Sequence, residues 1–346
     1  MASYIEIRAE VSLAANIAAK VTGLKSSDGL PPLFLEAKPG AFVDVESAAD
    51  WAQRNRPALD ELIEDHGVIV LRGFPLKTSA DFGKLGTAFP TFVGNYQGGA
   101  AARRSLDKGV YEATQRTGDQ TIYIHQEMFY VRDYPPRIGF FARKVAEKGG
   151  ETIIADMAKV TRNLPSAIRK KLETKGVLVI RNFAAPSGSN VETRLMDRRG
   201  WDFAFYTDSQ EEVNDVCRHR GMEPHWHDDG SLTVFSRLPA FVVHPSTGEE
   251  FYRTALHTNA RTKADLEKNE EAKRLLASQK IPSAMVLGDG EPLSDEEELT
   301  LAEIVDDATI YWKWQDGDVM ILDNLQIGHG RNPFEGERAT DLQMFS

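Results

Sequence analysis

The fold is decided by a stretch that reads Val319-Met320-Ile321-Leu322-Asp323-Asn324-Leu325-Gln326-Ile327-Gly328-His329-Gly330-Arg331. Its first four residues are apolar, which is typical of a buried strand, and the polar pair after them predicts a turn. A histidine follows that turn. Because a histidine placed beside a buried strand is a candidate metal ligand, we expect its partner ligands on other strands.

The best candidates for those partners are His125 and Glu127. They lie at the end of a strand predicted over residues 121–125, and in extended backbone residues i and i+2 point to the same face. Two histidines and one carboxylate on one face are the ligand set of non-haem iron(II) oxygenases. Taken alone, the pair is better explained by a strand histidine beside a surface acid, and it is His329 that favours a metal.

An arginine near a metal site points to an anionic ligand. Arg338 follows His329 closely, and a buried arginine is costly unless it faces an anion, preferably a carboxylate that two of its N–H groups can bind. The turn Gly149-Gly150-Glu151-Thr152 would bring a hydroxyl toward the same anion. The alternatives are a surface arginine paired with Glu335 or Glu337, and a threonine that is an ordinary strand residue.

Short apolar runs separated by turns predict many strands, and charged amphipathic segments predict helices. The expected strands cover residues 68–71, 121–125, 138–142, 152–155, 177–180, 232–235, 241–244 and 319–322. The expected helices cover 47–66, with a break or kink at Pro57, and 165–175, 208–219, 262–278 and 294–308. We therefore expect an α+β fold with a mainly β core, a barrel or jelly roll surrounded by helices. Residues 1–346 should form one domain with an insertion at about 160–310.

Composition and charge narrow the possible function classes. The chain has 346 residues and a net charge of -11 at pH 7, with no dense Lys/Arg block, so nucleic acid is not an expected partner. No stretch approaches the ~20 apolar residues of a membrane helix, and the N-terminus lacks the pattern of a signal peptide. The one cysteine, Cys217, cannot form an intramolecular disulfide. A cytoplasmic protein that does not bind membranes is expected, and its oligomeric state is left open.

Together these residues resemble the taurine/2-oxoglutarate dioxygenase (TauD/TfdA-like) family, in particular its clavaminate-synthase-like branch. The resemblance runs from about Val68 to Arg338. Three linked motifs carry it: His125-x-Glu127, the Gly-Gly-Glu-Thr-x-x-x-Asp context of Thr152, and His-Gly-Arg-x-Pro-Phe-x-Gly-x-Arg from His329. It implies that His125, Glu127 and His329 bind iron(II). It also implies that Thr152 and Arg338 bind the distal carboxylate of 2-oxoglutarate, and that the fold is a double-stranded β-helix, a distorted jelly roll.

The reaction that the resemblance implies uses O2 to convert 2-oxoglutarate to succinate and CO2 while a small-molecule substrate is hydroxylated. Halogenating relatives lack the carboxylate ligand, so Glu127 argues against a halogenase. Glutamate at this position is the form found among amino-acid hydroxylases. The expected substrate is therefore a small polar metabolite, an amino acid that is free or tethered to a carrier protein in secondary metabolism. A sulfonate or an aryloxyacid is the alternative substrate, and desaturation or ring formation is the alternative outcome.

A glycine-rich loop over residues 94–104 is the expected approach to the substrate. Its polar residues Asn95, Tyr96, Gln97 and Arg104 are candidate substrate contacts, and a solvated loop without ligand contact is the alternative.

The chain departs from the family after Arg338. Relatives continue with an apolar strand that closes the core, whereas residues 339–346 read Ala-Thr-Asp-Leu-Gln-Met-Phe-Ser. This predicts a strand that is short and polar at its start. The alternative function that follows is a non-catalytic jelly-roll binding module with a truncated C-terminal strand.

A second histidine pair gives a further alternative. His225 and His227 could bind zinc, as in a hydrolase, but no other ligands stand at a familiar spacing, so a surface or substrate-facing loop is expected. His257 should be a structural histidine with satisfied hydrogen bonds, and Trp312 and Trp314 should lie in the core.

Overall fold

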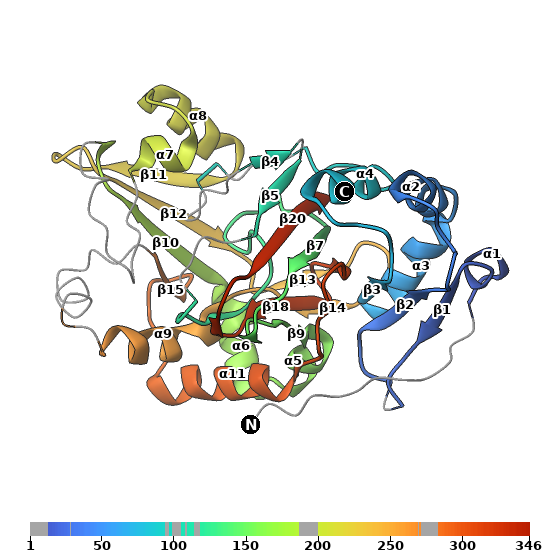
Figure 1. Ribbon diagram of the computed structural model, residues 1–346. Coiled ribbons are helices and arrows are strands. Elements are labelled where there is room, and N and C mark those ends of the chain that lie inside the picture. The colour runs from blue at the N-terminus through green and yellow to red at the C-terminus, as the bar shows by residue number, and fades with distance from the viewer. Residues whose placement is uncertain are drawn as a thin grey trace.

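The structure is a computed structural model, and Figure 1 shows its course. It describes residues 13–27, 29–93, 97–98, 105–107, 109–113, 118–186, 200–268, 270 and 283–346. Sheets occupy the centre of the molecule, and helices lie around them.

The largest sheet has eight strands in the order β1-β2-β3-β17-β7-β20-β5-β4. Their bounds are Val21–Leu24, Leu33–Ala37, Val68–Arg72, Val319–Asp323, Arg137–Lys144, Ala339–Phe345, Val110–Glu112 and Ser105–Asp107, in that order. β2 and β3 run parallel, and the other neighbours are antiparallel. The last strand of the chain, β20, therefore lies inside this sheet rather than at its edge.

A second sheet of four strands, in the order β16-β9-β18-β6, packs against the first. Its strands are Thr309–Ile310, Thr152–Asp156, Ile327–Arg331 and Ile122–His125. Phe140 and Met320 of the large sheet share one buried cluster with Ile154 and Ile327 of the second sheet. Packing the inner faces of two sheets against each other buries apolar side chains from both. A short ribbon of β8 (Lys148–Gly149) and β19 (Phe334–Glu335) lies beside them.

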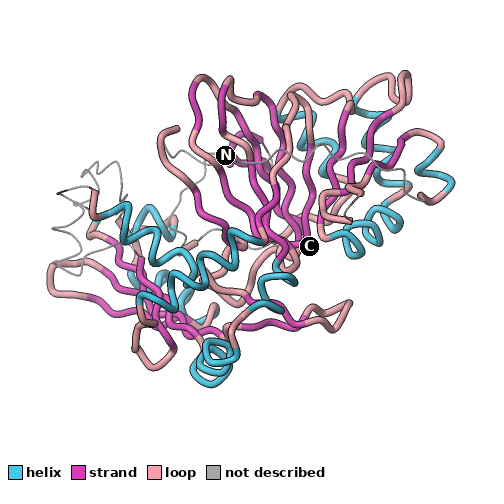
Figure 2. The backbone as a smooth tube through the Cα atoms, turned by 90° about the horizontal axis from the view of Figure 1, so that it is seen from below, coloured by secondary structure: helices cyan, strands magenta, loops and turns pink. Residues whose placement is uncertain are grey.

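Helices cover the outer faces of both sheets, as the views in Figures 1 and 2 show. Side chains of α2 (Val45–Arg54), α3 (Arg56–His66) and α4 (Ser79–Gly86) pack on the outer face of the large sheet. Those of α5 (Met157–Asn163), α6 (Ser166–Lys175) and α11 (Asp295–Asp307) pack on the outer face of the second sheet. Three further helical segments are α1 (Ala15–Ala18), η2 (Leu256–Thr258) and α9 (Asn259–Leu266).

The region expected to be an insertion contains a further sheet, in the order β11-β12-β10-β15. Its strands are Met222–Trp226, Leu232–Leu238, Val177–Phe183 and Ser283–Leu287. The helices α7 (Trp201–Phe205) and α8 (Gln210–His219) lie beside it, at the upper left of Figure 1. A hairpin of β13 (Phe241–Val243) and β14 (Glu250–Tyr252) leads back to the core.

The predicted break in the helix over residues 47–66 is confirmed, whereas the bounds of a later helix differ. The helix expected over 47–66 is divided at Asn55 into α2 and α3, with Pro57 in the first turn of α3. Proline has no N–H to donate and fits the first turn of a helix better than its interior. The helix expected over 262–278 begins earlier, at Asn259, and α9 ends at Leu266; residue 269 and residues 271–282 lie outside the described part.

The prediction of a short C-terminal strand was wrong, although the strand is polar at its start, as expected. β20 has seven residues and pairs with β7 along its whole length. Asp341 and Gln343, the polar residues that suggested a weak strand, are buried within the sheet. Arg143 of β7 donates to the Asp341 carboxylate at 3.3 Å, so pairing with a neighbouring cation makes burial of this charge tolerable.

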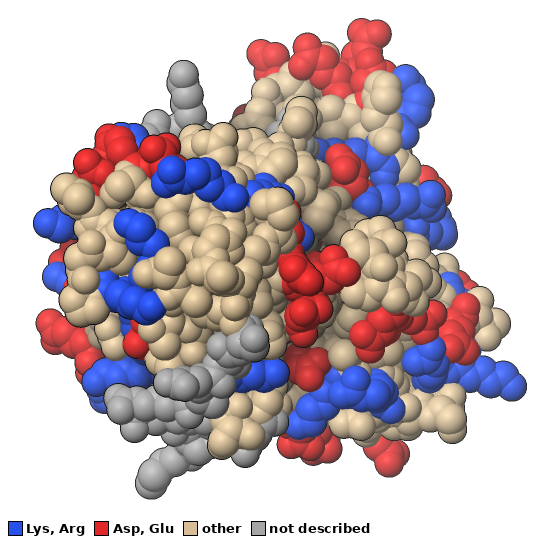
Figure 3. All heavy atoms as spheres, turned by 90° about the vertical axis from the view of Figure 1, so that its right-hand side faces the viewer, with Lys and Arg blue, Asp and Glu red and all other residues tan. Residues whose placement is uncertain are grey.

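The surface has mixed charge. On the face shown in Figure 3, Lys and Arg side chains alternate with Asp and Glu, and no continuous basic surface forms there. None of the helices in the described ranges is long and apolar enough to cross a membrane.

Candidate metal centre and cosubstrate pocket

Two neighbouring strands of the second sheet bring the candidate histidines together. β18 pairs with β6 so that His329 lies opposite His125, and the centroids of the two rings are 4.5 Å apart. Glu127 follows β6 by two residues. One ligand atom from each of the three side chains lies within 4.8 Å of the other two. In the described part of the chain, this is the one such group that could hold a metal ion.

The donor set fits a metal ion. Nδ1 of His125 lies 2.9 Å from the carbonyl oxygen of Tyr123, and since a carbonyl only accepts, Nδ1 carries the proton and Nε2 the lone pair. Nε2 of His329 lies 3.6 Å from Oε2 of Glu127, which is too long for a hydrogen bond. Two donors that each lie ~2.1 Å from one ion are about 3 to 4 Å apart. The separation therefore suits a shared ion.

Asn324 fixes the turn that carries Glu127. Its Oδ1 accepts from the Glu127 N–H at 2.7 Å, and its Nδ2 donates to the carbonyls of Glu127 at 3.0 Å and Pro135 at 2.8 Å. Asn324 is fully buried. Gln126 adds a bond from its own Nε2 to the carbonyl of Leu325 at 2.9 Å. The sequence marked Asn324 only as part of a polar turn, and no local pattern could indicate that its partners lie almost 200 residues earlier.

The turn before Thr152 lies against Arg338. Gly149 and Gly150 both have positive φ, 68° and 73°, a backbone conformation that residues other than glycine rarely adopt. A Cβ on Gly150 would also lie 2.9 Å from Cβ of Phe334 and 3.1 Å from Cδ of Arg338. The close approach allows Arg338 to donate from Nε to the Gly150 carbonyl at 2.7 Å and from Nη2 to Oγ1 of Thr152 at 3.1 Å.

The surroundings of Arg338 are electropositive. Burial and the nearby guanidinium of Arg331 lower the pKa of Arg338 to about 10, while Glu151 acts in the opposite direction. Arg338 stays protonated at neutral pH, and its two hydrogen-bond acceptors are neutral oxygens. Among the residues that the structure describes, no carboxylate forms an ion pair with it. A partly buried cation in this state favours an anionic ligand.

The remaining predicted residues have different outcomes. Asn95, Tyr96 and Arg104 lie outside the described residues. Gln97 is described, and its Nε2 donates to the carbonyl of Phe205 at 3.0 Å. This amide therefore contacts α7 of the insertion.

The second histidine pair does not form a metal site with other described residues. His225 lies on β11, not in a loop, and its ring is 4.8 Å from that of His227. Nε2 of His227 bonds to Oγ1 of Thr233 at 2.8 Å. No third metal-ligating side chain in the described ranges joins the two rings.

The predictions for His257 and the tryptophans are confirmed. Nε2 of the buried His257 donates to the carbonyl of Ile124 at 2.8 Å, and burial lowers the pKa of this histidine to about 4. Trp312 and Trp314 are buried and stacked, with ring centroids 5.1 Å apart. Nε1 of Trp314 donates to the carbonyl of Thr152 at 2.9 Å, so this tryptophan also supports the turn beside Arg338.

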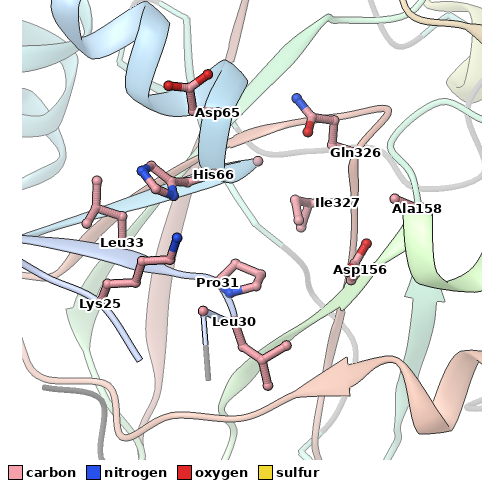
Figure 4. Close-up of a pocket in the computed structure, with 12 residues that line it drawn as sticks. Lys25, Leu30, Pro31, Leu33, Asp65, His66, Asp156, Ala158, Gln326 and Ile327 are labelled. Atoms are coloured by element: carbon pink, nitrogen blue, oxygen red, sulfur yellow. The ribbon is translucent and has the colours of Figure 1, made fainter. Parts of the chain in front are cut away.

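A cleft of about 200 Å³ lies at the other end of the β9–β18 strand pair. Figure 4 shows Lys25 and His66 on one side of it and Asp156 and Gln326 on the other. Asp156 is opposite Ile327, whereas Thr152 is opposite Arg331. Four residues of strand span about 13 Å, so this cleft is distinct from the surroundings of Arg338 and Thr152.

Comparison with known proteins identifies the class to which this fold and site belong. Residues 27–344 match the model of the taurine catabolism dioxygenase TauD, TfdA family. The chain belongs to this family, and it is a non-haem Fe(II)- and 2-oxoglutarate-dependent dioxygenase, with O2 as the second cosubstrate.

Particular relatives can be named. The chain is 30% identical to the dapdiamide synthesis protein DdaC of Enterobacter agglomerans over 286 residues. This alignment covers 83% of this chain and 84% of DdaC. It is 29% identical to a clavaminate synthase-like protein of Arabidopsis thaliana, over 81% of this chain and 82% of that protein. Among solved structures, PvcB of Pseudomonas aeruginosa has a similar fold, with a TM-score of 0.52 and 14% identity over 98% of this chain and 95% of that chain.

Proposed function

We propose that this dioxygenase hydroxylates a small polar metabolite, an amino acid that is free or tethered to a carrier protein, in secondary metabolism. The observation that carries the proposal is the clustering of Glu127 with two histidines, together with a partly buried arginine, Arg338, that has no carboxylate partner among the described residues. The name of the relative DdaC, a dapdiamide synthesis protein, supports a role in biosynthesis.

In this proposal His125, Glu127 and His329 hold the iron. When bound, the iron, together with 2-oxoglutarate and O2, supplies an oxidative decarboxylation that yields succinate, CO2 and the hydroxylated substrate. The protein contributes the orientation of the ligands: the Tyr123 carbonyl fixes the tautomer of His125, and Asn324 fixes the backbone of Glu127. Phe140 of the large sheet lies against His329 of the second sheet, with ring centroids 5.0 Å apart, and this placement of a ligand between two packed sheets supports a double-stranded β-helix fold.

Arg338 and Thr152 are proposed to bind the distal carboxylate of 2-oxoglutarate. A guanidinium can bind a carboxylate through two parallel N–H bonds, and the Thr152 hydroxyl, which now accepts from Nη2 at 3.1 Å, has its own proton to donate. The Gly149-Gly150 turn brings the two groups together. The packing of the second sheet between the large sheet and α5, α6 and α11 supports one catalytic domain that includes the insertion.

Metal analysis and succinate release test this proposal. After anaerobic reconstitution, the wild-type protein should hold one iron per chain, and Glu127→Ala should lose it. His227→Ala is the matched control and should retain the metal. Wild-type protein should release succinate faster with one of a panel of free L-amino acids, and a sulfonate and an aryloxyacid in the same panel test the alternative substrates. Loss of metal only from His227→Ala would contradict the assignment.

A further inference from the structure

Arg181 is a buried arginine that takes no part in the site described so far. Arg181 lies on β10, where buried and less buried residues alternate, and it shares the inner face of this sheet with Val179 and Phe183. Only 3% of its surface is exposed. Within the part of the chain that the structure describes, neither Nη1 nor Nη2 of Arg181 has a hydrogen-bond partner, and no carboxylate pairs with it.

The contacts of Arg181 do not compensate for its burial. Its Cζ lies 4.3 Å from the ring centroid of Tyr130 and 5.1 Å from that of Phe183. Such cation–π contacts contribute about 0.5 to 2 kcal/mol, whereas burying an unpaired ion costs several kcal/mol. Two aromatic rings also accept none of the in-plane N–H groups of a guanidinium. Among the described residues, Arg181 is therefore a buried cation whose charge no anion compensates.

A second polar group without a partner lies on the same face. Ser236 of β12 is 2% exposed, and its Oγ has no hydrogen-bond partner in the described part of the protein. In the register of β10 with β12, Ser236 lies opposite Val179 and Arg181 lies opposite Val234. Arg181 and Ser236 are thus diagonal neighbours, about 7 to 8 Å apart. One small anion can contact both side chains.

This face lies over the turn that carries a proposed metal ligand. Tyr130, which stacks on Arg181, follows Glu127 by three residues, and three residues of chain span at most about 11 Å. The turn is compact, because the N–H of Phe129 bonds to the carbonyl of Gln126 and that of Val131 to the carbonyl of Met128. Arg181 therefore packs on the short turn that carries Glu127, and Phe183 on the same face shares one buried cluster with Met128 of this turn.

Arg253, a second buried arginine at the same turn, has a structural role and serves as a comparison for Arg181. Arg253 is also buried and lies 3.6 Å from the ring of Tyr134, but its Nη2 donates to the carbonyl of Met128 at 3.0 Å and its Nη1 to that of Val131 at 3.3 Å. These bonds hold the turn at Met128, whose φ is 56°. Arg253 has protein acceptors for both terminal nitrogens, whereas Arg181 has none among the residues that the structure describes.

We propose that Arg181 and Ser236 form a subsite for a carboxylate of the substrate. This inference rests on the proposed function and narrows it: the substrate carries a free carboxylate while its reacting carbon lies at the metal. An amino acid attached to a carrier through its single carboxyl group does not satisfy the subsite. A free amino acid does, and so does a tethered one with a second carboxylate.

The test compares thermal melting in sodium acetate with melting in sodium chloride at equal ionic strength. Acetate should raise the melting temperature of the wild-type protein by about 2 °C, and this rise should be absent in Arg181→Met. Arg338→Met should keep the rise, which shows that acetate does not act at the proposed 2-oxoglutarate pocket. Arg237→Met, an exposed arginine on β12 paired with Glu223, is the matched control and should also keep it.

The outcomes are separable from those of the proposed function. An equal acetate rise in Arg181→Met and wild type, or no rise in wild type, would overturn the subsite. If Arg181→Met does not fold, Ser236→Ala takes its place and should show a smaller rise than wild type. Binding of Fe(II) and 2-oxoglutarate should be unchanged in Arg181→Met and Ser236→Ala; its absence from the wild type as well would refute the dioxygenase assignment and not the subsite.

Discussion

Asn324 offers a test of how the protein orients a metal ligand that is not itself changed. Asn324→Leu keeps the size of the side chain and removes three hydrogen bonds, to the Glu127 N–H, the Glu127 carbonyl and the Pro135 carbonyl. Each buried polar group that loses its partner costs about 1 to 3 kcal/mol. Because water can hydrogen-bond to some of these groups, we expect the free energy of unfolding to fall by about 3 to 5 kcal/mol.

The same change should weaken metal binding. Groups that orient metal ligands contribute about 10- to 100-fold in affinity, so Fe(II) should bind Asn324→Leu about 10- to 100-fold more weakly than wild type. Urea unfolding of the apo-protein measures the first effect, and anaerobic Fe(II) titration calorimetry measures the second.

Asn259→Leu is the matched control for this experiment. The Asn259 amide likewise donates to two acceptors, the carbonyl of Met285 and Oε1 of Glu298, both at 2.9 Å. Its replacement should lower stability and leave the affinity for Fe(II) unchanged. If Asn324→Leu binds Fe(II) as tightly as wild type, the account of how Glu127 is held is wrong.

Three further predictions follow from contacts around the core. Gly150→Ala should weaken 2-oxoglutarate binding and lower stability by at least about 1 kcal/mol, because φ is positive and the new Cβ meets Arg338; isothermal titration and urea unfolding measure both, and wild-type behaviour would contradict the tight turn. The pKa of His257 is near 6.5 in the unfolded chain and about 4 in the folded chain, so the free energy of unfolding should fall by up to about 3 kcal/mol as the pH is lowered from 6.5 to 4. The midpoint of urea unfolding should fall less steeply over this range in His257→Gln than in wild type. Asp318→Ala removes the carboxylate to which Arg72 donates at 2.9 and 2.7 Å, and should lower the free energy of unfolding in urea by about 2 to 4 kcal/mol. A decrease below about 0.5 kcal/mol would show that solvent already screens this ion pair.

The sequence predicted the parts of the site that lie close together along the chain. His125 and Glu127 do come together with His329, but β6 ends at His125 and Glu127 lies in the turn that follows, so strand alternation is not what places it; His329 follows a recognisable apolar strand and turn. What spacing alone could not predict is the register that sets His329 opposite His125. His329 was expected just after a strand and turn, and it lies within a second strand, β18.

Features that depend on distant partners were missed. Asp341 suggested a weak C-terminal strand because its partner, Arg143, is far away in the sequence. The parallel pairing of β2 with β3 lies in a segment for which no strand was expected before residue 68. Arg181, a cation in an apolar strand, gave no local signal, since only the packing of β10 over the turn after Glu127 determines that it is buried.

The most direct test of the central claim is anaerobic visible absorption of the apo-protein, titrated with Fe(II) and then with 2-oxoglutarate. We predict a weak charge-transfer band that needs both additions, disappears in Glu127→Ala with loss of the metal, and disappears in Arg338→Met while the metal is retained. A folded wild-type protein that binds iron but gives no band with 2-oxoglutarate, or an undiminished band in Arg338→Met, would contradict the assignment of this site.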